Sequence, residues 1–327
     1  MEEVIEDLKN IYVPKNNSHK GQNGKLLIVG GSHLFHAASL WSLTIASRIV
    51  DMVFFSSVDE NNQITIDLKK EFRNGMVIPR SEIDHYAKEA DCILIGPGMM
   101  RTESQPLTLN RQPLTLNDIN QLTDEGEQTF YLTKYLLEHY PTKRFVIDAG
   151  ALQMLNPDFL LNLSKMPILT PHKGEFERLL RNHELGKKVG AASVEEYPDN
   201  TQANGMSEHW REGNTWQDPD MVKAFAKKYN CIILLKGEKD LVVSPTKEVE
   251  IPGGNAGMTK GGTGDVLAGL TAALYAQNEN PFSVAVSSSF FNKKAGEELF
   301  KSVGYYFNST DLANEIPKVM KKYLLKK

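Results

Sequence analysis

Six short apolar runs alternate with helical patterns along this chain, and this alternation restricts its fold more than any other feature. The runs are rich in Ile, Val and Leu without strict polar alternation, as is typical of parallel strands covered on both faces. They lie at 25–31, 51–57, 91–98, 144–150, 167–172 and 231–237. The pattern predicts an α/β fold with three α/β/α layers around a mostly parallel sheet.

Helical patterns at 127–140 and 218–230 separate the later runs. In the second pattern Asp218 can cap a helix and Pro219 suits its first turn. Four apolar residues there share one helical face: Met221, Val222, Phe225 and Tyr229. After residue 237 the rhythm changes, because 240–245 and 248–253 favour a hairpin and helices follow to the end.

Five of the predicted strands run directly into Gly, Asp or His. Their ends read "IVGGSH", "IGPG", "IDAG", "LTPHKGE" and "LLKGE". Ligands of open α/β sheets bind beyond the carboxyl ends of the strands. These ends therefore predict one ligand-binding rim.

Charge and composition exclude several classes of protein. The 327 residues carry a formal net charge of -4, which argues against a nucleic-acid binder. Cys92 and Cys231 each begin an apolar run, so we expect two buried thiols in a reducing cytosol. Arg48 and Asp51 interrupt the apolar stretch 37–57, which favours a buried helix followed by a strand over a membrane span. We expect a cytoplasmic protein with no membrane or nucleic-acid partner.

The segment 255–269, "NAGMTKGGTGDVLAG", places a glycine-rich loop before a helical pattern. Free N–H groups at a helix N-terminus bind anions, and glycines let the backbone close around phosphate oxygens. The Walker pattern is missing, as is GxGxxG after the first strand. Asp265 has two readings: it is a first-turn helix residue, or it is a base that deprotonates a hydroxyl while the loop holds a phosphoryl group. The loop alone leaves both open.

The same segment resembles the C-terminal signature of the ADP- or ATP-dependent NAD(P)H-hydrate dehydratases of the ribokinase-like superfamily. Further motifs follow in the family's order: "KGQNGKLLIVGGS", "DCILIGPGM", "FVIDAGAL", "LTPHKGEFERLL" and "IILLKG". Together they cover 20–275 apart from two probable insertions. The resemblance implies a ribokinase-like fold and one catalytic domain over 1–327.

The family phosphorylates hydrated NADH or NADPH with ATP or ADP, and loss of the phosphate regenerates the cofactor. By resemblance, Asp265 activates the substrate hydroxyl, and Ala38, Gly98 and His172 contact the hydrate. The residues implied to bind the nucleotide are Lys236, Gly237, Asn255, Gly262, Thr263 and Gly264. Phosphate chemistry suggests Mg²⁺, although the sequence shows no convincing set of ligands.

Four positions depart from the family's pattern. Gly150 stands where Asp is usual, Met100 where Gly is common, Lys173 in place of Pro, and Asp240 in place of Thr. The change at Gly150 weakens a metal or substrate role there. Asp240 puts a nucleotide contact in doubt, because a carboxylate near phosphate needs a cation.

Only a short segment precedes the first matching strand, so no fused epimerase domain is expected. The chain would act on the (S)-epimer and rely on a separate epimerase, or on spontaneous exchange, for the other. By analogy with relatives we expect a homo-oligomer, for example a tetramer.

Insertions are predicted at about 101–125 and 182–217. In the first, "QPLTLN" occurs at 105–110 and again at 112–117, which indicates a loop expansion. The second is polar and lacks clear periodicity, and a lid, a disordered excursion and an oligomer contact all remain open. His33 and His36 are three residues apart, but no Cys or carboxylate joins them at ligand spacing, so we expect no metal there.

Two alternatives to the dehydratase remain. One is another ribokinase-like small-molecule kinase that stops at the phosphorylated product. The other is a non-catalytic nucleotide-binding relative. Recovery of NADH from its hydrate would distinguish the dehydratase from both.

Overall fold

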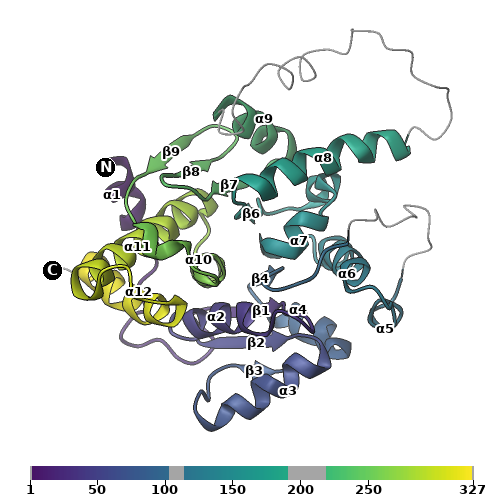
Figure 1. Cartoon of the computed structure of the whole chain (residues 1–327), viewed down its shortest axis with the longest axis horizontal. Coiled ribbons are helices and arrows are strands. Elements are labelled where there is room, and N and C mark those ends of the chain that lie inside the picture. The colour runs from purple at the N-terminus through teal and green to yellow at the C-terminus, as the bar shows by residue number, and fades with distance from the viewer. Residues whose placement is uncertain (1, 103–113, 191–218, 326–327) are drawn as a thin grey trace.

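The computed structural model describes residues 2–102, 114–190 and 219–325, and its centre is one sheet (Figure 1). Its strands are β1 (Lys25–Val29), β2 (Met52–Ser56), β3 (Met76–Val77), β4 (Cys92–Ile95), β5 (Arg144–Ile147), β6 (Ile168–Leu169), β7 (Ile232–Leu235), β8 (Asp240–Val243) and β9 (Glu248–Ile251). The order is β3-β2-β1-β4-β5-β6-β7-β8-β9. Neighbours from β3 to β7 are parallel, whereas β8 and β9 pair antiparallel.

Each of the six predicted apolar runs contains a strand, and the predicted hairpin is β8–β9. The strands are shorter than the runs, because the Gly, Asp and His residues at their ends lie in the following loops. Strand β3 is missing from the sequence prediction. It has only two residues, too few to form a recognisable apolar run.

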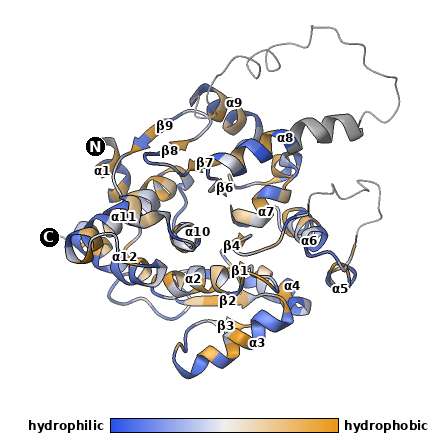
Figure 2. Cartoon of the chain, viewed as in Figure 1, coloured by the Kyte–Doolittle hydropathy of each residue, from blue (hydrophilic) through white to orange (hydrophobic). Residues whose placement is uncertain are grey.

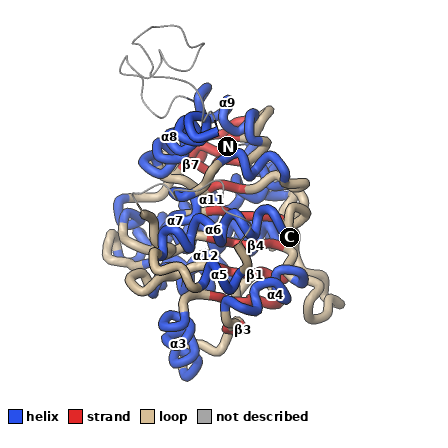
Figure 3. Tube along the Cα trace, turned by 90° about the vertical axis from the view of Figure 1, so that its right-hand side faces the viewer, coloured by secondary structure: helices blue, strands red, loops and turns tan. Residues whose placement is uncertain are grey.

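Helices cover both faces of the sheet (Figures 1 and 3). They are α1 (Glu2–Lys9), α2 (His36–Ala46), α3 (Asp59–Asp67), α4 (Ile83–Glu89), α5 (Leu116–Asn120), α6 (Glu125–His139), α7 (Ala149–Met154), α8 (Lys173–Gly190), α9 (Pro219–Tyr229), α10 (Thr263–Gln277), α11 (Pro281–Val303) and α12 (Ser309–Leu324). Alternate strand residues face opposite sides. Leu26 and Ile28 pack in one core with α2, α10 and α11, and Leu27 and Val29 in the other with α4, α6 and α9.

The helical patterns agree with the structure. Helix α9 begins at Pro219, as predicted, and buries Val222, Phe225 and Tyr229, while Asp218 lies outside the described residues. In Figure 2 the helices carry hydrophilic and hydrophobic residues side by side, as expected for helices with one face on a sheet. Both cysteines are buried free thiols, as predicted.

The predicted insertions lie partly outside the described residues. In the first, Thr115 caps α5 through a capping box with Asp118. In the second, the prediction of a loop from residue 182 was wrong, because 182–190 continue helix α8. Glu, Leu and Lys there are good helix formers, and this propensity favours the helix over the predicted loop. Residues 191–217, and with them the question of a lid, lie outside the described part.

No helix in the described part of the chain is long and apolar enough to cross a membrane. The strand order reverses between β1 and β4, the neighbours at the centre of the parallel sheet. Loops leaving such a pair of strands diverge and open a crevice at their carboxyl ends. Gly31 N–H donates to the Pro97 carbonyl at 2.7 Å, so the glycine-rich loops that follow β1 and β4 lie side by side.

Candidate active site

The glycine-rich loop before α10 is held by side chains from three directions. Gly262 is the N-cap with φ 91°, and a Cβ there would lie 2.2 Å from the Trp41 ring, so only glycine fits. The Thr263 hydroxyl donates to the Met258 and Lys260 carbonyls at 2.6 and 2.9 Å. Ser309 Oγ of α12 donates to the Gly261 carbonyl at 2.7 Å. The loop is therefore preorganised.

The open side of this loop offers room for an anion. Within the described chain, the Gly264 and Asp265 amides have no backbone acceptor. A Cβ at Gly261 would meet nothing within 4 Å, and one at Gly264 would meet only Lys236 Nζ, at 3.5 Å. Packing therefore does not explain why these two positions are glycine. Both positions instead border open space next to the start of helix α10.

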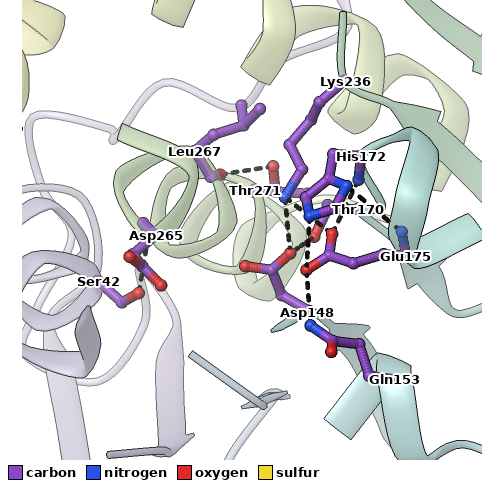
Figure 4. Close-up of polar contacts among 10 residues, drawn as sticks. All are labelled: Ser42, Asp148, Gln153, Thr170, His172, Glu175, Lys236, Asp265, Leu267 and Thr271. Atoms are coloured by element: carbon purple, nitrogen blue, oxygen red, sulfur yellow. Dashed lines mark hydrogen bonds and ion pairs between the residues drawn. The ribbon is translucent and has the colours of Figure 1, made fainter. Parts of the chain in front are cut away.

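Asp265 faces a cluster of charged side chains from three other strand ends (Figure 4). Lys236, directly after β7, places Nζ 3.0 Å from Asp148 Oδ1 and 3.7 Å from Glu175 Oε2. Asp148, directly after β5, also accepts a hydrogen bond from Thr170 Oγ1 at 2.8 Å. Two carboxylates thus contact one ammonium group, and the Asp265 carboxylate lies close enough to feel the charges of all three.

The crowding of carboxylates changes their proton affinity. The pKa of Asp265 is raised to about 7: burial is the largest cause, Asp148 and Glu175 add to it, and Lys236 partly opposes them. Burial also raises the pKa of Asp148 despite Lys236. For Lys236, burial lowers the pKa, but the attraction of Asp148 and Glu175 is larger and the net pKa is raised. Lys236 stays charged, and Asp265 has the pKa of a general base that works near neutral pH.

His172 lies at the end of β6, beside Lys236 in the backbone ladder. Its backbone N–H donates to Glu175 Oε2 at 2.8 Å. Its side chain is 60% exposed, whereas that of Glu175 is 6% exposed. The ring is therefore the part of this cluster that a ligand can reach most easily.

The two small residues predicted to line the hydrate pocket come together from different segments. Gly98 has φ 72°, and a Cβ there would lie 2.9 Å from the Ala38 Cβ and 2.8 Å from the Phe35 carbonyl oxygen. Ala38 is one turn before Ser42 on α2. Ser42 Oγ donates to the Asp265 backbone carbonyl at 2.7 Å. Helix α2 therefore contacts Gly98 through Ala38 and Asp265 through Ser42.

A cavity of about 670 Å³ opens beside the glycine-rich loop, within the size range of small-molecule sites. Its lining includes Gly237, Gly253, Gly254, Asn255, Met258 and Lys293. Asn255 is fixed there, because its Oδ1 accepts from Gly257 N–H at 2.9 Å and its Nδ2 donates to the Gly296 carbonyl at 2.8 Å. Two predicted nucleotide-binding residues, Gly237 and Asn255, thus share one cavity.

The model of the NAD(P)H-hydrate dehydratase family matches residues 26–318. The chain belongs to this family. It is 30% identical to an ADP-dependent (S)-NAD(P)H-hydrate dehydratase of Nitrosopumilus maritimus, over 95% of this chain and 94% of that protein. It is 32% identical to a bifunctional NAD(P)H-hydrate repair enzyme of Methanocaldococcus jannaschii, over 96% of this chain but only 52% of that protein. The chain therefore spans about half of that two-function relative.

Solved structures show the fold. A ribokinase-like superfamily protein of Enterococcus faecalis superposes with a TM-score of 0.71 at 20% identity, covering 98% of this chain and 95% of that one. An ADP/ATP-dependent NAD(P)H-hydrate dehydratase of Bacillus subtilis, co-crystallised with ATP and Mg²⁺, gives 0.66 at 20% identity over 98% and 97%. The dehydratase family and the ribokinase-like fold, both predicted from the sequence, are confirmed.

The departure from the dehydratase pattern at Asp240 has a structural explanation. Its carboxylate accepts hydrogen bonds from Gly237 N–H at 3.0 Å and Ser289 Oγ at 2.7 Å. Lys293 Nζ lies 3.3 Å away and also donates to the Gly237 carbonyl. The cation that a carboxylate near phosphate requires is therefore Lys293, from α11.

Gly150 departs from the family for a steric reason. A Cβ at this position would lie 2.1 Å from the Met99 carbonyl oxygen in the loop after β4. The aspartate usual in the dehydratases cannot fit without moving that loop. Asp148, two residues earlier, is the carboxylate that this strand end contributes to the cluster.

The described residues contain no group of three or more His, Cys, Asp or Glu side chains arranged to hold a metal. The His33 ring contacts Glu125, whose hydrogen bond raises the pKa of His33. Nδ1 of His36 is buried without a hydrogen-bond partner.

Sequence reasoning missed Glu175, Thr170, Trp41, Ser42 and Lys293. Glu175 carried a signal, because His172-x-x-Glu175 after a strand has the spacing of a capping box. Lys293 and Ser289 lie on α11, far along the chain from Asp240, and only the fold brings them together.

Proposed function

We propose that this dehydratase-family chain converts the (S)-epimer of hydrated NADH or NADPH back to NADH or NADPH, at the expense of ADP or ATP. The supporting observation is the Asp265 carboxylate, which lies next to the open glycine loop and has a pKa raised to about 7 although the charge of Lys236 opposes that rise. The Nitrosopumilus relative, matched over 94% of its length, carries this activity in its name.

The first step is phosphoryl transfer to the hydrate. Asp265 takes the proton of the substrate hydroxyl as its oxygen bonds to the terminal phosphorus of the nucleotide. The bond from that phosphorus to the leaving nucleotide oxygen breaks, and AMP or ADP departs. The Gly264 and Asp265 amides and Lys236 stabilise the negative charge on the transferring group.

The second step is loss of phosphate. The lone pair of the ring nitrogen expels phosphate from the neighbouring carbon, and a carbon–nitrogen double bond forms. A proton then leaves the next ring carbon, its electron pair forms the carbon–carbon double bond, and the positive charge on nitrogen is cancelled. NADH or NADPH, inorganic phosphate and one proton result.

The cavity beside the glycine-rich loop and the close approach of Ala38 and Gly98 support the positions that we propose for the two substrates. The nucleoside occupies the cavity lined by Gly237 and Asn255, and its phosphates point toward Gly262, Thr263 and Gly264. In this assignment Thr263 contributes its backbone, since its hydroxyl is bonded inside the loop. The hydrate occupies the opposite side of Asp265, between Ala38, Gly98 and His172.

Mg²⁺ fits this arrangement as an ion that arrives with the nucleotide. It usually binds substrate phosphates and only one or two carboxylates. Asp148 and Glu175 are the nearby carboxylates, and both already contact Lys236. Excess negative charge in this cluster would repel phosphates, and a divalent ion on their oxygens would offset the repulsion.

The test is incubation of purified hydrated NADH or NADPH with the protein, Mg²⁺, and ADP or ATP in separate reactions. We expect the near-ultraviolet absorbance of the dihydronicotinamide to return, with one phosphate released per cofactor. A phosphorylated hydrate without recovered absorbance would instead identify a kinase. Nucleotide binding without any turnover would identify a non-catalytic relative.

We also propose an epimerase as functional partner, because the Methanocaldococcus relative is named a bifunctional NAD(P)H-hydrate repair enzyme. With pure (R)-hydrate the reaction should be limited by spontaneous epimerisation and accelerate when an epimerase is added.

We propose that the protein forms a homo-oligomer, for example a tetramer, and light scattering of the purified protein tests this. A cytoplasmic location is likewise a proposal, which cell fractionation tests.

A further inference from the structure

The start of helix α8 contains a reciprocal pair of hydrogen bonds between His172 and Glu175. The Glu175 backbone N–H donates to His172 Nδ1 at 3.3 Å, and the His172 backbone N–H donates to Glu175 Oε2 at 2.8 Å. This is the capping-box arrangement, with histidine in the position that serine or threonine usually takes. Gly174 leaves space for the ring, since a Cβ there would already lie 3.3 Å from His172 Cε1.

The cap determines where the ring carries its proton. A nitrogen that accepts an N–H bond holds no proton, so Nδ1 is bare and the proton of the neutral ring is on Nε2. Nε2 lies 3.6 Å from Glu175 Oε1, beyond a normal hydrogen bond. The Nε2–H group is therefore only weakly engaged, on a side chain that is 60% exposed.

Glu175 is itself held in place. Gln153 Nε2 donates to its Oε1 at 3.2 Å, and Lys236 Nζ lies 3.7 Å from its Oε2. Both carboxylate oxygens therefore face donors (Figure 4). If the side chain at position 175 carried an N–H group, that group would point at the N–H group of Gln153 or Lys236 with no acceptor between them.

We infer that His172 caps helix α8 through Nδ1 and thereby presents a single tautomer, with Nε2–H as a hydrogen-bond donor, to an oxygen acceptor on the hydrated nicotinamide. This inference rests on the proposed function. The carboxamide and hydroxyl oxygens are the acceptors on that ring. Glu175 acts through His172 as a positioning residue.

The same geometry excludes His172 as the base. Its Nδ1 lone pair is used by the helix, and its Nε2 already carries a proton. Protonation of Nδ1 would break the cap. Proton abstraction is thus left to Asp265, and His172 contributes orientation of the hydrate.

The tautomer can be observed directly by NMR on the intact protein labelled with ¹⁵N-histidine. The His172→Asn variant assigns the His172 signals by their disappearance. We expect a bare Nδ1 and a protonated Nε2 at neutral pH, and a change at Nε2–H when hydrated NADH is added without nucleotide. A proton on Nδ1, or a doubly protonated ring, would overturn the inference.

Two variants separate the cap from the substrate contact. His172→Asn keeps a cap, because Asn accepts well at this position, but its short side chain cannot replace Nε2–H. We expect wild-type thermal stability and a fall in kcat/KM for the hydrate of about 10-fold, the value of one hydrogen bond. His172→Ala should show the same kinetic loss together with a lower melting temperature. The KM for nucleotide should stay unchanged in both.

Glu175→Gln tests the positioning role. Its amide would place a donor against Gln153 or Lys236, so the side chain should lose its place in the cap and kcat/KM for the hydrate should fall, whereas the tautomer, set by the backbone N–H at Nδ1, should stay the same. A His172→Asn variant with the wild-type kcat/KM for the hydrate would refute the substrate contact. If His172→Asn and His172→Ala both melted at the wild-type temperature, the cap would be refuted. The NMR result does not depend on turnover. A defined tautomer without turnover of hydrate would therefore reject the proposed function and leave the cap intact.

Discussion

Asp265 should make the free protein less stable above neutral pH than it would be without this carboxylate. Its pKa is raised to about 7, so the folded state binds the proton more tightly than the unfolded chain does. The stability associated with that proton is fully present below pH 3.8, the ordinary Asp value, and is lost as the pH rises through about 7. Asp265→Asn removes this titration.

The size of the effect follows from the two pKa values. The difference between 3.8 and about 7 corresponds to an upper bound of roughly 4 kcal/mol. Asn lacks the favourable interaction of a carboxylate with the α10 N-terminus, which is worth about 0.3–1 kcal/mol. Water around the half-buried side chain lowers the upper bound further. We expect Asp265→Asn to be more stable than wild type above pH 7 by about 2 kcal/mol.

Urea unfolding at a series of pH values measures this difference. The free energies of unfolding of variant and wild type should diverge between about pH 4 and 8. Asp51→Asn is a control of opposite sign: burial would raise the pKa of Asp51, but hydrogen bonds from Asn23 and Gly21 lower it. This control should lose stability above pH 4. A pH-independent difference between Asp265→Asn and wild type, or a less stable variant at pH 8, would refute the reasoning. In the same variant, turnover should fall by about 10² or more, with nucleotide affinity retained.

Three further predictions concern the same site. The value of kcat/KM for the hydrate should rise as the pH increases through about 7, because Asp265 must lose its proton; a flat profile would exclude it as the base. Gly264→Val should weaken ADP binding in calorimetry with little loss of stability, whereas Gly262→Val should lower the melting temperature through its clash with Trp41. Lys293→Met should cost about 3–5 kcal/mol in urea unfolding by leaving Asp240 buried without its cation, and adding Asp240→Thr should recover most of it.

Much of the fold could be predicted from local sequence, because both faces of the central strands are covered and the runs are continuously apolar. Helix α1 escaped prediction although it carried a signal. Val4, Leu8 and Ile11 are buried at helical spacing. The edge strand β3 could not be predicted, because it has only two residues. Short elements depend on tertiary contacts more than on their own propensity.

The site residues, like the elements of the fold, include some that the local sequence indicates and some that only tertiary contacts explain. Asp265, His172 and Lys236 follow strands or precede a helix within recognisable motifs, so the sequence could indicate them. The contacts that set their chemistry are not local. Glu175 and Asp148 raise the pKa of Asp265 only because three strand ends meet, and no spacing along the chain encodes that charge excess.

One helix–helix contact links the two sides of the proposed reaction. Ala38, Trp41 and Ser42 lie three and four residues apart and share a face of α2. Trp41 packs against the glycine loop and Ser42 bonds the Asp265 carbonyl at 2.7 Å. A Cβ at Gly269 would lie 2.6 Å from Ser42 Cα, so this glycine sets how closely α2 approaches α10. In the proposed mechanism, any change in that approach would move Ala38 relative to Asp265. Because a displacement of about 1 Å can cost about 10²-fold in rate, we expect a larger residue at Gly269 to lower turnover even though it touches neither substrate.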